Sequence, residues 1–172
     1  MDQKLQQPQL LQVALDRNDV VYSPDWVAAD MVEYFKPSGS ILEPCKGSGV
    51  FMRYLPTAAW CEIDQGKDFF SWVEPVDWVF GNPPYAQFTK WMTHSMEIGQ
   101  NVCYLVPLNK FFLTAGFIEM MLKWGGIKHM RYFGDGRKLG FPMGYAVGAA
   151  HLQRGYRGGM TMSDGSKCRE IA

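Results

Sequence analysis

The sequence predicts a strand followed by a stiff polar turn in the stretch Val76-Asp77-Trp78-Val79-Phe80-Gly81-Asn82-Pro83-Pro84-Tyr85. The apolar run predicts a buried strand from Val76 to Phe80. The two prolines have restricted backbone dihedrals and no N–H donors, so the turn presents carbonyl oxygens and the Asn82 amide. The Asn82 side-chain oxygen and the Pro83 carbonyl can accept the two hydrogens of an exocyclic amino group, and Tyr85 offers a flat face to a planar ring. The alternative is a rigid turn that ends in a packed tyrosine.

A glycine-rich turn follows an earlier short strand, predicted at Ile41 to Glu43. The turn Glu43-Pro44-Cys45-Lys46-Gly47-Ser48-Gly49 places two glycines where the chain must bend and where a ligand can approach the backbone. A second predicted strand, Ala58 to Ile63, carries Glu62 at its end, where a carboxylate can accept hydrogen bonds from both hydroxyls of a ribose. Met52 stands where the third glycine of the dinucleotide fingerprint would fall, which disfavours NAD and FAD. The two features together favour a nucleoside cofactor without a pyrophosphate.

Helices alternate with these strands along the chain. Ser23 is the predicted N-cap of a helix whose first residue is Pro24. The alternation predicts a wound, mostly parallel α/β sheet, in a single domain over residues 1–172 with residues 1–19 as a loosely held arm. The other predicted elements are a short helical segment at Val50–Leu55, a helix with Phe88, Trp91, Met92 and Met96 on one face that Gly99 ends, a helix from the Thr114 cap to Trp124, and strands at Asn101–Val106, Ile127–Phe133 and Tyr145–Gln153.

The composition is that of an ordinary globular domain, with 47% apolar, 15% aromatic and 20% charged residues. No run reaches the roughly 18 to 20 apolar residues of a membrane span and the N-terminus is polar, so we expect a cytoplasmic protein with no membrane partner. The four cysteines lie far apart with no Cys-x-x-Cys pair, so we expect buried free thiols. The three histidines do not share the helical spacing of metal ligands, so no metal site is predicted. Residues 1–109 carry seven basic and thirteen acidic side chains, and the remainder ten basic and four acidic. This asymmetry suggests a C-terminal part that faces a polyanion, with ordinary solvated charge as the alternative.

In these residues and their order, the chain resembles the class I S-adenosylmethionine-dependent methyltransferases. Among them it is most similar to the amino-group DNA methyltransferases, whose signature is Asp/Asn/Ser-Pro-Pro followed by an aromatic residue. The resemblance implies S-adenosylmethionine as cofactor and adenine N6 in DNA as the methyl acceptor, since Asn82 stands where cytosine-N4 enzymes usually carry serine. It also implies a catalytic motif of Asn82, Pro83, Pro84 and Tyr85. The implied cofactor-binding residues are Tyr22, Ser23, Pro24, Glu43, Pro44, Gly47, Gly49, Glu62, Ile63, Asp68, Phe69 and Asn82.

The resemblance also assigns tasks to individual side chains. Asp68 is expected to accept from the amino group of the cofactor's adenine, with Phe69 against its ring. The target adenine is expected to be flipped out of duplex DNA and stacked on Tyr85. The segment after the strand Leu105-Val106-Pro107 is expected to help hold that base, and the implied substrate-binding residues in it are Lys110, Phe111 and Phe112.

The implied fold is a Rossmann-like sheet, mostly parallel with an antiparallel C-terminal strand. Only five residues separate Glu62 from Asp68, too few for the usual helix and strand, so the sheet is expected to be trimmed near its third strand. The 65 residues after Pro107 are too few for a separate target-recognition domain. Any sequence readout is therefore expected from loops such as Gly134 to Tyr145, where Arg137 and Lys138 would contact phosphates, from the basic C-terminal tail, or from another subunit.

Three alternatives stay open on the sequence. An RNA adenine-N6 methyltransferase would use the same pair of acceptors, the Asn82 side-chain oxygen and the Pro83 carbonyl, which we call the clamp. A protein glutamine-N5 methyltransferase would place a carboxamide in it, although such enzymes usually carry an N-terminal helical domain for which residues 1–19 are too short. A cofactor-binding module without catalysis is disfavoured by the intact Asn82 and Tyr85. The sequence also leaves homodimerisation open.

Overall fold

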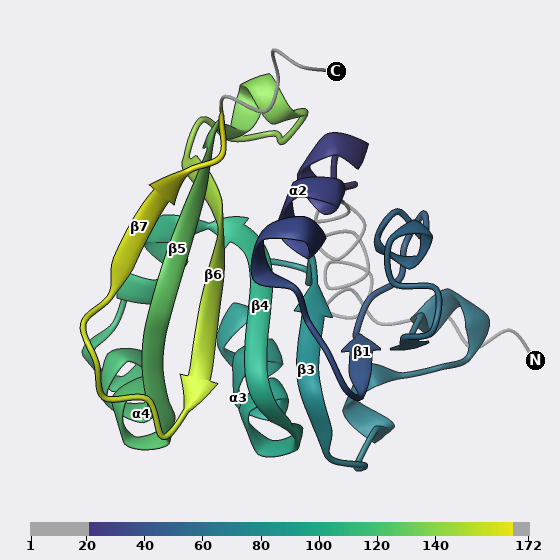
Figure 1. Cartoon of the computed structure of the whole chain (residues 1–172), viewed down its shortest axis with the longest axis horizontal. Coiled ribbons are helices and arrows are strands. Elements are labelled where there is room, and N and C mark those ends of the chain that lie inside the picture. Colours follow the sequence, from purple (N-terminus) through teal and green to yellow (C-terminus); the bar gives the residue numbers. More distant parts are fainter. Residues whose placement is uncertain (1–20, 167–172) are drawn as a thin grey trace, which may run out of the picture.

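A seven-stranded mixed sheet with helices on both faces forms the framework of the protein (Figure 1). The computed structural model describes residues 21–166, so the predicted arm and Cys168 lie outside the described residues. The α-helices are α2 (Asp25–Phe35), α3 (Phe88–Ile98) and α4 (Ala115–Trp124). The strands are β1 (Ile41–Glu43), β2 (Ala59–Trp60), β3 (Val76–Gly81), β4 (Gly99–Pro107), β5 (Gly125–Asp135), β6 (Ala146–Arg154) and β7 (Thr161–Asp164), and their order in the sheet is β2-β1-β3-β4-β6-β5-β7.

The strand directions confirm the predicted Rossmann-like sheet. Strands β2, β1, β3 and β4 run parallel to one another, whereas β6 lies antiparallel between β4 and β5. The sequence pattern does not predict β7, which pairs parallel with β5 at the edge of the sheet. Its four residues are exposed except for the half-buried Ser163, so they show no apolar alternation.

The sheet is trimmed beyond β2, as expected. β2 has two residues rather than the six of the predicted strand, because the chain leaves the sheet at Cys61. Two short 3-10 turns, η2 (Ile63–Gln65) and η3 (Phe69–Ser71), then lead to β3. The predicted helical segment at Val50–Leu55 is also a single 3-10 turn, η1 (Phe51–Arg53). So short a segment cannot repay the cost of nucleating an α-helix.

The start of α2 differs from the prediction. Pro24, not Ser23, is the N-cap, because its ψ of 142° is extended and its carbonyl accepts from the N–H groups of Val27 and Ala28. No side chain caps the helix, and the Ser23 hydroxyl is buried without a hydrogen-bond partner among the described residues. Proline restricts φ but leaves ψ open, so Pro24 can stand just before the helix as well as inside it.

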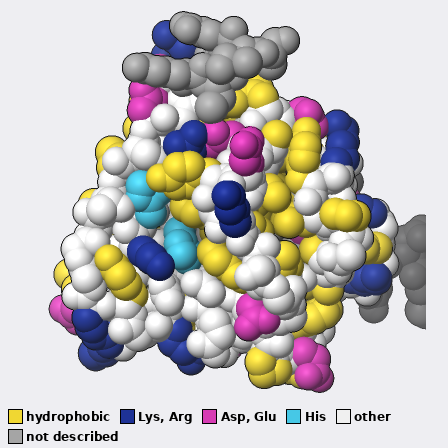
Figure 2. Space-filling view, in the orientation of Figure 1, with side chains coloured by type: hydrophobic (Ala, Val, Ile, Leu, Met, Phe, Trp, Pro, Cys, Tyr) yellow, Lys and Arg dark blue, Asp and Glu magenta, His cyan; other side chains and the backbone are white. Residues whose placement is uncertain are grey.

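α2 covers one face of the sheet, and α3 and α4 cover the other (Figure 1). A buried ion pair fixes α2 to β5: the Arg131 guanidinium donates to both carboxylate oxygens of Asp30, at 2.6 Å for the Nη2–Oδ1 contact. Histidine and hydrophobic side chains gather beside α2 on this face (Figure 2). There the Tyr34 hydroxyl lies 3.0 Å from Nε2 of His129.

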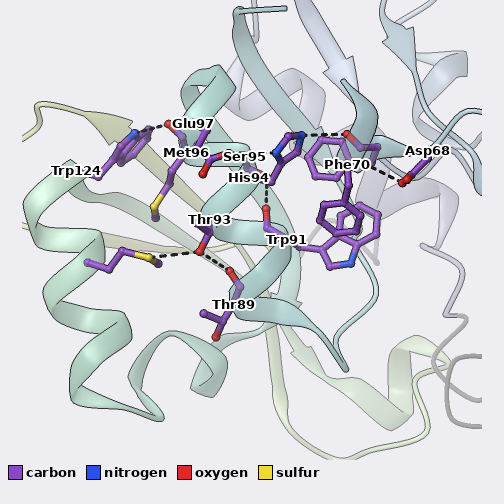
Figure 3. Close-up of polar contacts among 12 residues, drawn as sticks. Asp68, Phe70, Thr89, Trp91, Thr93, His94, Ser95, Met96, Glu97 and Trp124 are labelled. Atoms are coloured by element: carbon purple, nitrogen blue, oxygen red, sulfur yellow. Dashed lines mark hydrogen bonds and ion pairs between the residues drawn. The ribbon is translucent and has the colours of Figure 1, made fainter. Parts of the chain in front are cut away.

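The apolar stripe predicted for α3 is confirmed, with its four residues all buried. On the same face of the sheet, the Thr93 hydroxyl of α3 contacts the sulfur of Met120 in α4 at 3.4 Å (Figure 3). Thr114 caps α4 as predicted, accepting from the Phe117 N–H at 3.3 Å. Within residues 21–166, none of the helices has the length and apolarity needed to cross a bilayer.

Candidate active site

Two turns meet at the carboxyl ends of β1 and β3, which are neighbours in the sheet. Because the two strands are parallel, the turns that follow them lie at the same edge. Together with the chain before α2 they line one pocket of about 550 Å³, counted out to its open mouth. The pocket brings together eight residues expected from the sequence, namely Tyr22, Ser23, Glu43, Gly47, Asn82, Pro83, Pro84 and Tyr85.

Six further residues line the pocket. Three of them belong to the glycine turn expected at the site, and the other three lie within two residues of an expected site residue, which is the only signal they carry. The six residues are Val21, Cys45, Lys46, Ser48, Val50 and Phe51.

No group of three or more His, Cys, Asp or Glu side chains that could hold a metal ion occurs within residues 21–166.

The glycine turn is left-handed at two positions, with φ of 50° at Gly47 and 78° at Gly49. This conformation favours glycine, whereas a Cβ on Gly47 would make only an ordinary van der Waals contact, at 3.5 Å, with the Tyr22 ring. The Gly47 N–H donates a hydrogen bond of 2.6 Å to one carboxylate oxygen of Glu62. Glu62 therefore stands beside the turn, although it does not line the pocket.

Two buried polar atoms in the pocket wall have no hydrogen-bond partner among the described residues: Oγ of Ser23 and Oε2 of Glu43. Burial raises the pKa of Glu43 to about 8, while Lys46 lowers it and Glu62 raises it further. Buried polar groups are almost always hydrogen-bonded, so these atoms can bind a polar ligand or a water molecule. A carboxyl and a hydroxyl in one wall fit the amino-acid end of S-adenosylmethionine, whose ammonium donates and whose carboxylate accepts.

Hydrogen bonds fix both ends of the Asn82 amide. Its Nδ2 donates to the Val21 carbonyl at 2.8 Å, and its Oδ1 accepts from the Tyr85 hydroxyl at 2.7 Å. The Val21 carbonyl can only accept, which dictates that Oδ1 faces the tyrosine. The Tyr85 hydroxyl also lies 3.3 Å from the Leu105 carbonyl. It has one proton, so it can donate fully to only one of these two acceptors.

The Tyr85 ring is covered by another aromatic ring. Only 3% of Tyr85 is exposed, and the Phe141 ring lies parallel to it, with centroids 6.1 Å apart and planes at 9°. Phe141 belongs to the expected DNA-contacting loop, which includes the 3-10 turn η5 (Gly136–Leu139). Phe141 could not be expected at the site from the sequence, because nothing in the loop pattern indicates that this ring reaches the Asn82–Tyr85 turn.

The structure places the two phenylalanines expected at the target base outside the pocket. Phe111 is fully buried and packs edge-on against Phe88, with centroids 5.1 Å apart. Phe112 is 53% exposed. Lys110 does reach the turn, because its Nζ donates to the Tyr85 carbonyl at 3.1 Å.

The residues expected at the cofactor's adenine also lie outside the pocket lining. Asp68 accepts from the Phe70 N–H at 3.0 Å (Figure 3). Phe69 is 2% exposed and stacks on Trp91, with centroids 4.8 Å apart. Ile63, expected only as a cofactor-binding residue, is 68% exposed in η2 and does not line the pocket. Three more expected residues are absent from the lining, namely Pro24, Pro44 and Gly49.

Three arginines of the basic C-terminal part form contacts within the fold. Arg131 forms the buried ion pair with α2. Arg154 donates to carbonyls at the end of α3, and Arg157 donates to carbonyls at the end of α4. Arg137 and Lys138 are exposed on η5, in the loop that carries Phe141. Three of the basic side chains behind the charge asymmetry therefore bond to other parts of the fold.

No family model and no curated protein matches the sequence. Solved structures do match in fold. A protein from Listeria monocytogenes assigned to the class I S-adenosylmethionine-dependent methyltransferases has a TM-score of 0.63 at 16% identity, over 93% of this chain and 72% of that chain. A type I restriction-modification methyltransferase subunit from Streptococcus thermophilus has a TM-score of 0.59 at 14% identity, over 91% of this chain and 51% of that chain.

A protein from Pyrococcus horikoshii assigned as an RNA methyltransferase has a TM-score of 0.53 at 15% identity, over 85% of this chain and 98% of that chain. The present chain thus spans about half the length of the restriction-modification subunit and nearly all of the Pyrococcus protein. With its mostly parallel sheet and one antiparallel strand, the chain has the Rossmann-like fold of these class I methyltransferase structures.

Proposed function

We propose that the protein transfers the methyl group of S-adenosylmethionine to the N6 amino group of adenine in DNA. One observation carries the proposal: the glycine turn at Gly47 and the turn from Asn82 to Tyr85 line the same pocket. The likeness in fold to a restriction-modification methyltransferase subunit supports DNA as the substrate.

Ser23, Glu43 and Glu62 are the residues that would hold the cofactor. The first two have unpartnered buried atoms in the pocket wall, and Glu62 lies beside the glycine turn with lone pairs left for ribose hydroxyls. The exposed Ile63 follows Glu62 and can pack on an adenine ring. When bound, S-adenosylmethionine supplies a sulfonium methyl, so that an N–C bond forms as the S–C bond breaks and the substrate amine loses one proton to solvent.

The turn at Asn82 would orient and activate the amine. Oδ1 of Asn82 and the carbonyl of Pro83 each accept one hydrogen, which makes the nitrogen more pyramidal and more nucleophilic. The Tyr85 hydroxyl occupies one of the two lone pairs of Oδ1 and leaves the other for the amine, and the Leu105 carbonyl offers the hydroxyl another acceptor. The Val21 carbonyl meanwhile keeps Nδ2 turned away from the substrate.

Tyr85 and Phe141 would enclose the flipped base. A base between two rings needs roughly 7 Å between their planes, about twice the 3.4 Å stacking rise of DNA. The present centroid separation is 6.1 Å, so the loop with Phe141 must move outward as the base enters. Arg137 and Lys138 lie in that loop and would contact phosphates.

The test supplies the purified chain with labelled S-adenosylmethionine and, separately, with duplex DNA, RNA and cellular protein. We expect label in N6-methyladenine from the DNA, identified by mass spectrometry of the nucleosides. Label confined to RNA adenine or to protein glutamine would overturn the assignment of DNA as substrate.

Asn82→Ala separates the two halves of the site. It should lower kcat/KM at least ~100-fold, since it removes a group that acts on the reacting amine. Cofactor affinity by calorimetry should stay nearly intact. Asn101→Ala is the matched control, because its amide bonds to His151 and to the Asp77 carbonyl away from the pocket. A collapse of cofactor affinity in Asn82→Ala would show that the two sites are misassigned.

A further inference from the structure

A second cavity adjoins the catalytic turn. It is a groove of about 740 Å³, counted out to its open surface, between the first turns of α3 and α4. We call it the α3–α4 groove and define it by Gln87, Lys90, Lys110, Leu113 and Thr114. Tyr85 lines both the groove and the cofactor pocket, so the two cavities are neighbours at the catalytic turn.

The groove has the mixed chemistry of a nucleotide site. Leu113, Phe88 and Phe117 supply apolar surface, and Gln87 and Thr114 supply hydrogen-bonding groups. Its lining includes two lysines and no acidic side chain. An apolar surface with a few polar groups suits a base or sugar, and uncompensated positive charge suits a phosphate.

Lys110 links the groove to the clamp. Its Nζ donates to the Tyr85 carbonyl, and an ammonium group has three protons, so it can serve a second acceptor at the same time. Lys90 lies over the Phe70 ring, with Nζ 3.9 Å from the centroid. The helix dipole of α3, which begins after Gln87 without a side-chain cap, adds positive potential at this end.

We propose that the α3–α4 groove binds the nucleotide next to the target adenosine in the substrate strand, with Lys110 contacting the phosphate that joins the two. The inference rests on the proposed function and adds a subsite to it.

Single-phosphate interference tests the subsite. The substrate is a DNA duplex that carries one site mapped from the wild-type product, with one phosphate at a time replaced by a neutral methylphosphonate. We expect wild-type kcat/KM to fall about three- to tenfold at one of the two phosphates that flank the target. Lys110→Gln should lower kcat/KM on the unmodified duplex by a similar factor and become insensitive to the methylphosphonate at that position.

A second variant leaves the catalytic turn untouched. Leu113→Glu places a carboxylate in the groove, and the 61% exposure of Leu113 means that it costs the core little. It should weaken DNA binding in fluorescence anisotropy about three- to tenfold without changing cofactor affinity. The matched controls lie on α4 outside the groove lining: Lys123→Gln, and Leu122→Glu at a residue that is 56% exposed.

The outcomes separate this inference from the proposed function. Lys110→Gln that keeps the wild-type interference at every phosphate overturns the groove assignment, even if it lowers activity by displacing the Tyr85 turn. The groove assignment is also overturned if Leu113→Glu binds DNA with the same affinity as the control Leu122→Glu. A wild-type protein that neither methylates nor binds DNA overturns the proposed function itself.

Discussion

The hydroxyl of Tyr85 donates a hydrogen bond of 2.7 Å to Oδ1 of Asn82. The oxygen proposed to bind the substrate amine therefore has a partner before substrate arrives. An amide oxygen has two lone pairs, so the substrate amine can bind the second one, but an oxygen shared between two donors binds each less strongly. The nearby Leu105 carbonyl can accept the Tyr85 hydroxyl instead and so relieve that sharing.

Tyr85→Phe should lower the KM for DNA by up to about tenfold, because it removes the second donor from the shared oxygen and a hydrogen bond is worth roughly 0.5–1.5 kcal/mol. Tyr85→Ala should lower kcat/KM about ten- to hundredfold, because it also removes the ring that stacks on the base. Steady-state kinetics measure both. Tyr104→Phe is the control: it deletes another buried hydroxyl, bonded to Ser95, and should leave KM unchanged. A raised KM in Tyr85→Phe would show that the hydroxyl assists binding.

Cofactor affinity should depend on pH through Glu43. Burial raises the pKa of Glu43 to about 8, so at pH 7 most of the ligand-free protein carries a neutral carboxyl. An ammonium ligand favours the carboxylate, so binding releases a proton, and affinity should rise by up to about tenfold per pH unit below pH 8. It should fall again as the amino group of the ligand loses its proton near pH 8. Calorimetry in buffers of different ionisation enthalpy counts the protons, and Glu43→Gln should abolish the release.

The same carboxyl should shape the stability of the ligand-free protein. Its folded-state pKa lies above the ordinary value of 4.5, so its contribution is complete below pH 4.5 and is lost as pH rises through 8. Glu43→Gln should therefore match wild type near pH 4.5 and exceed it at pH 8 to 9 by on the order of a few kcal/mol. Urea unfolding at both pH values measures the difference, and a difference that does not change with pH would contradict the prediction.

Neutralising Arg137 and Lys138 together, each to Gln, should weaken DNA binding. The slope of log Kd against log salt concentration should fall by about one to two, as expected for the loss of one or two phosphate contacts. A Lys36→Gln, Lys123→Gln double variant removes the same charge from two other exposed positions and should keep the wild-type slope. Equal slopes in the two double variants would make Arg137 and Lys138 ordinary surface residues.

Breaking the ion pair between Asp30 and Arg131 should destabilise the protein strongly. The two side chains are only 9% and 10% exposed, so Asp30→Ala leaves a buried charge and should cost about 3–5 kcal/mol in urea unfolding. Adding Arg131→Met should recover much of that loss. Arg53→Ala, which breaks the exposed pair with Asp25, should cost less than about 1 kcal/mol. Similar costs for the two pairs would contradict this account.

Features that depend on neighbouring residues could be predicted from the sequence. The stripe on α3 follows from helical spacing, and the cap on α4 follows from a threonine placed before an apolar run. The two polar turns also follow from local chemistry, because glycine and proline limit the backbone at those positions. Since both turns end parallel strands, their meeting in one pocket could be predicted as well.

Other side chains could not be placed from local pattern. An aromatic run in a short 3-10 segment does not tell which ring turns inward, so Phe69 and Phe111 are expected at the site and are found in the core. The length of β2 and the existence of β7 depend on strand pairing, which sequence alternation over two to four residues cannot indicate.

The sequence by itself determined the alternation of strands and helices as far as β6 and the stiff turn at Asn82, because each depends on residues close together in the chain. Only the tertiary structure decided that Phe141 covers Tyr85, and that Arg131 pairs with Asp30 across 101 residues instead of meeting a polyanion. These contacts join segments that are distant in the chain, and their geometry is set by how the sheet and helices pack.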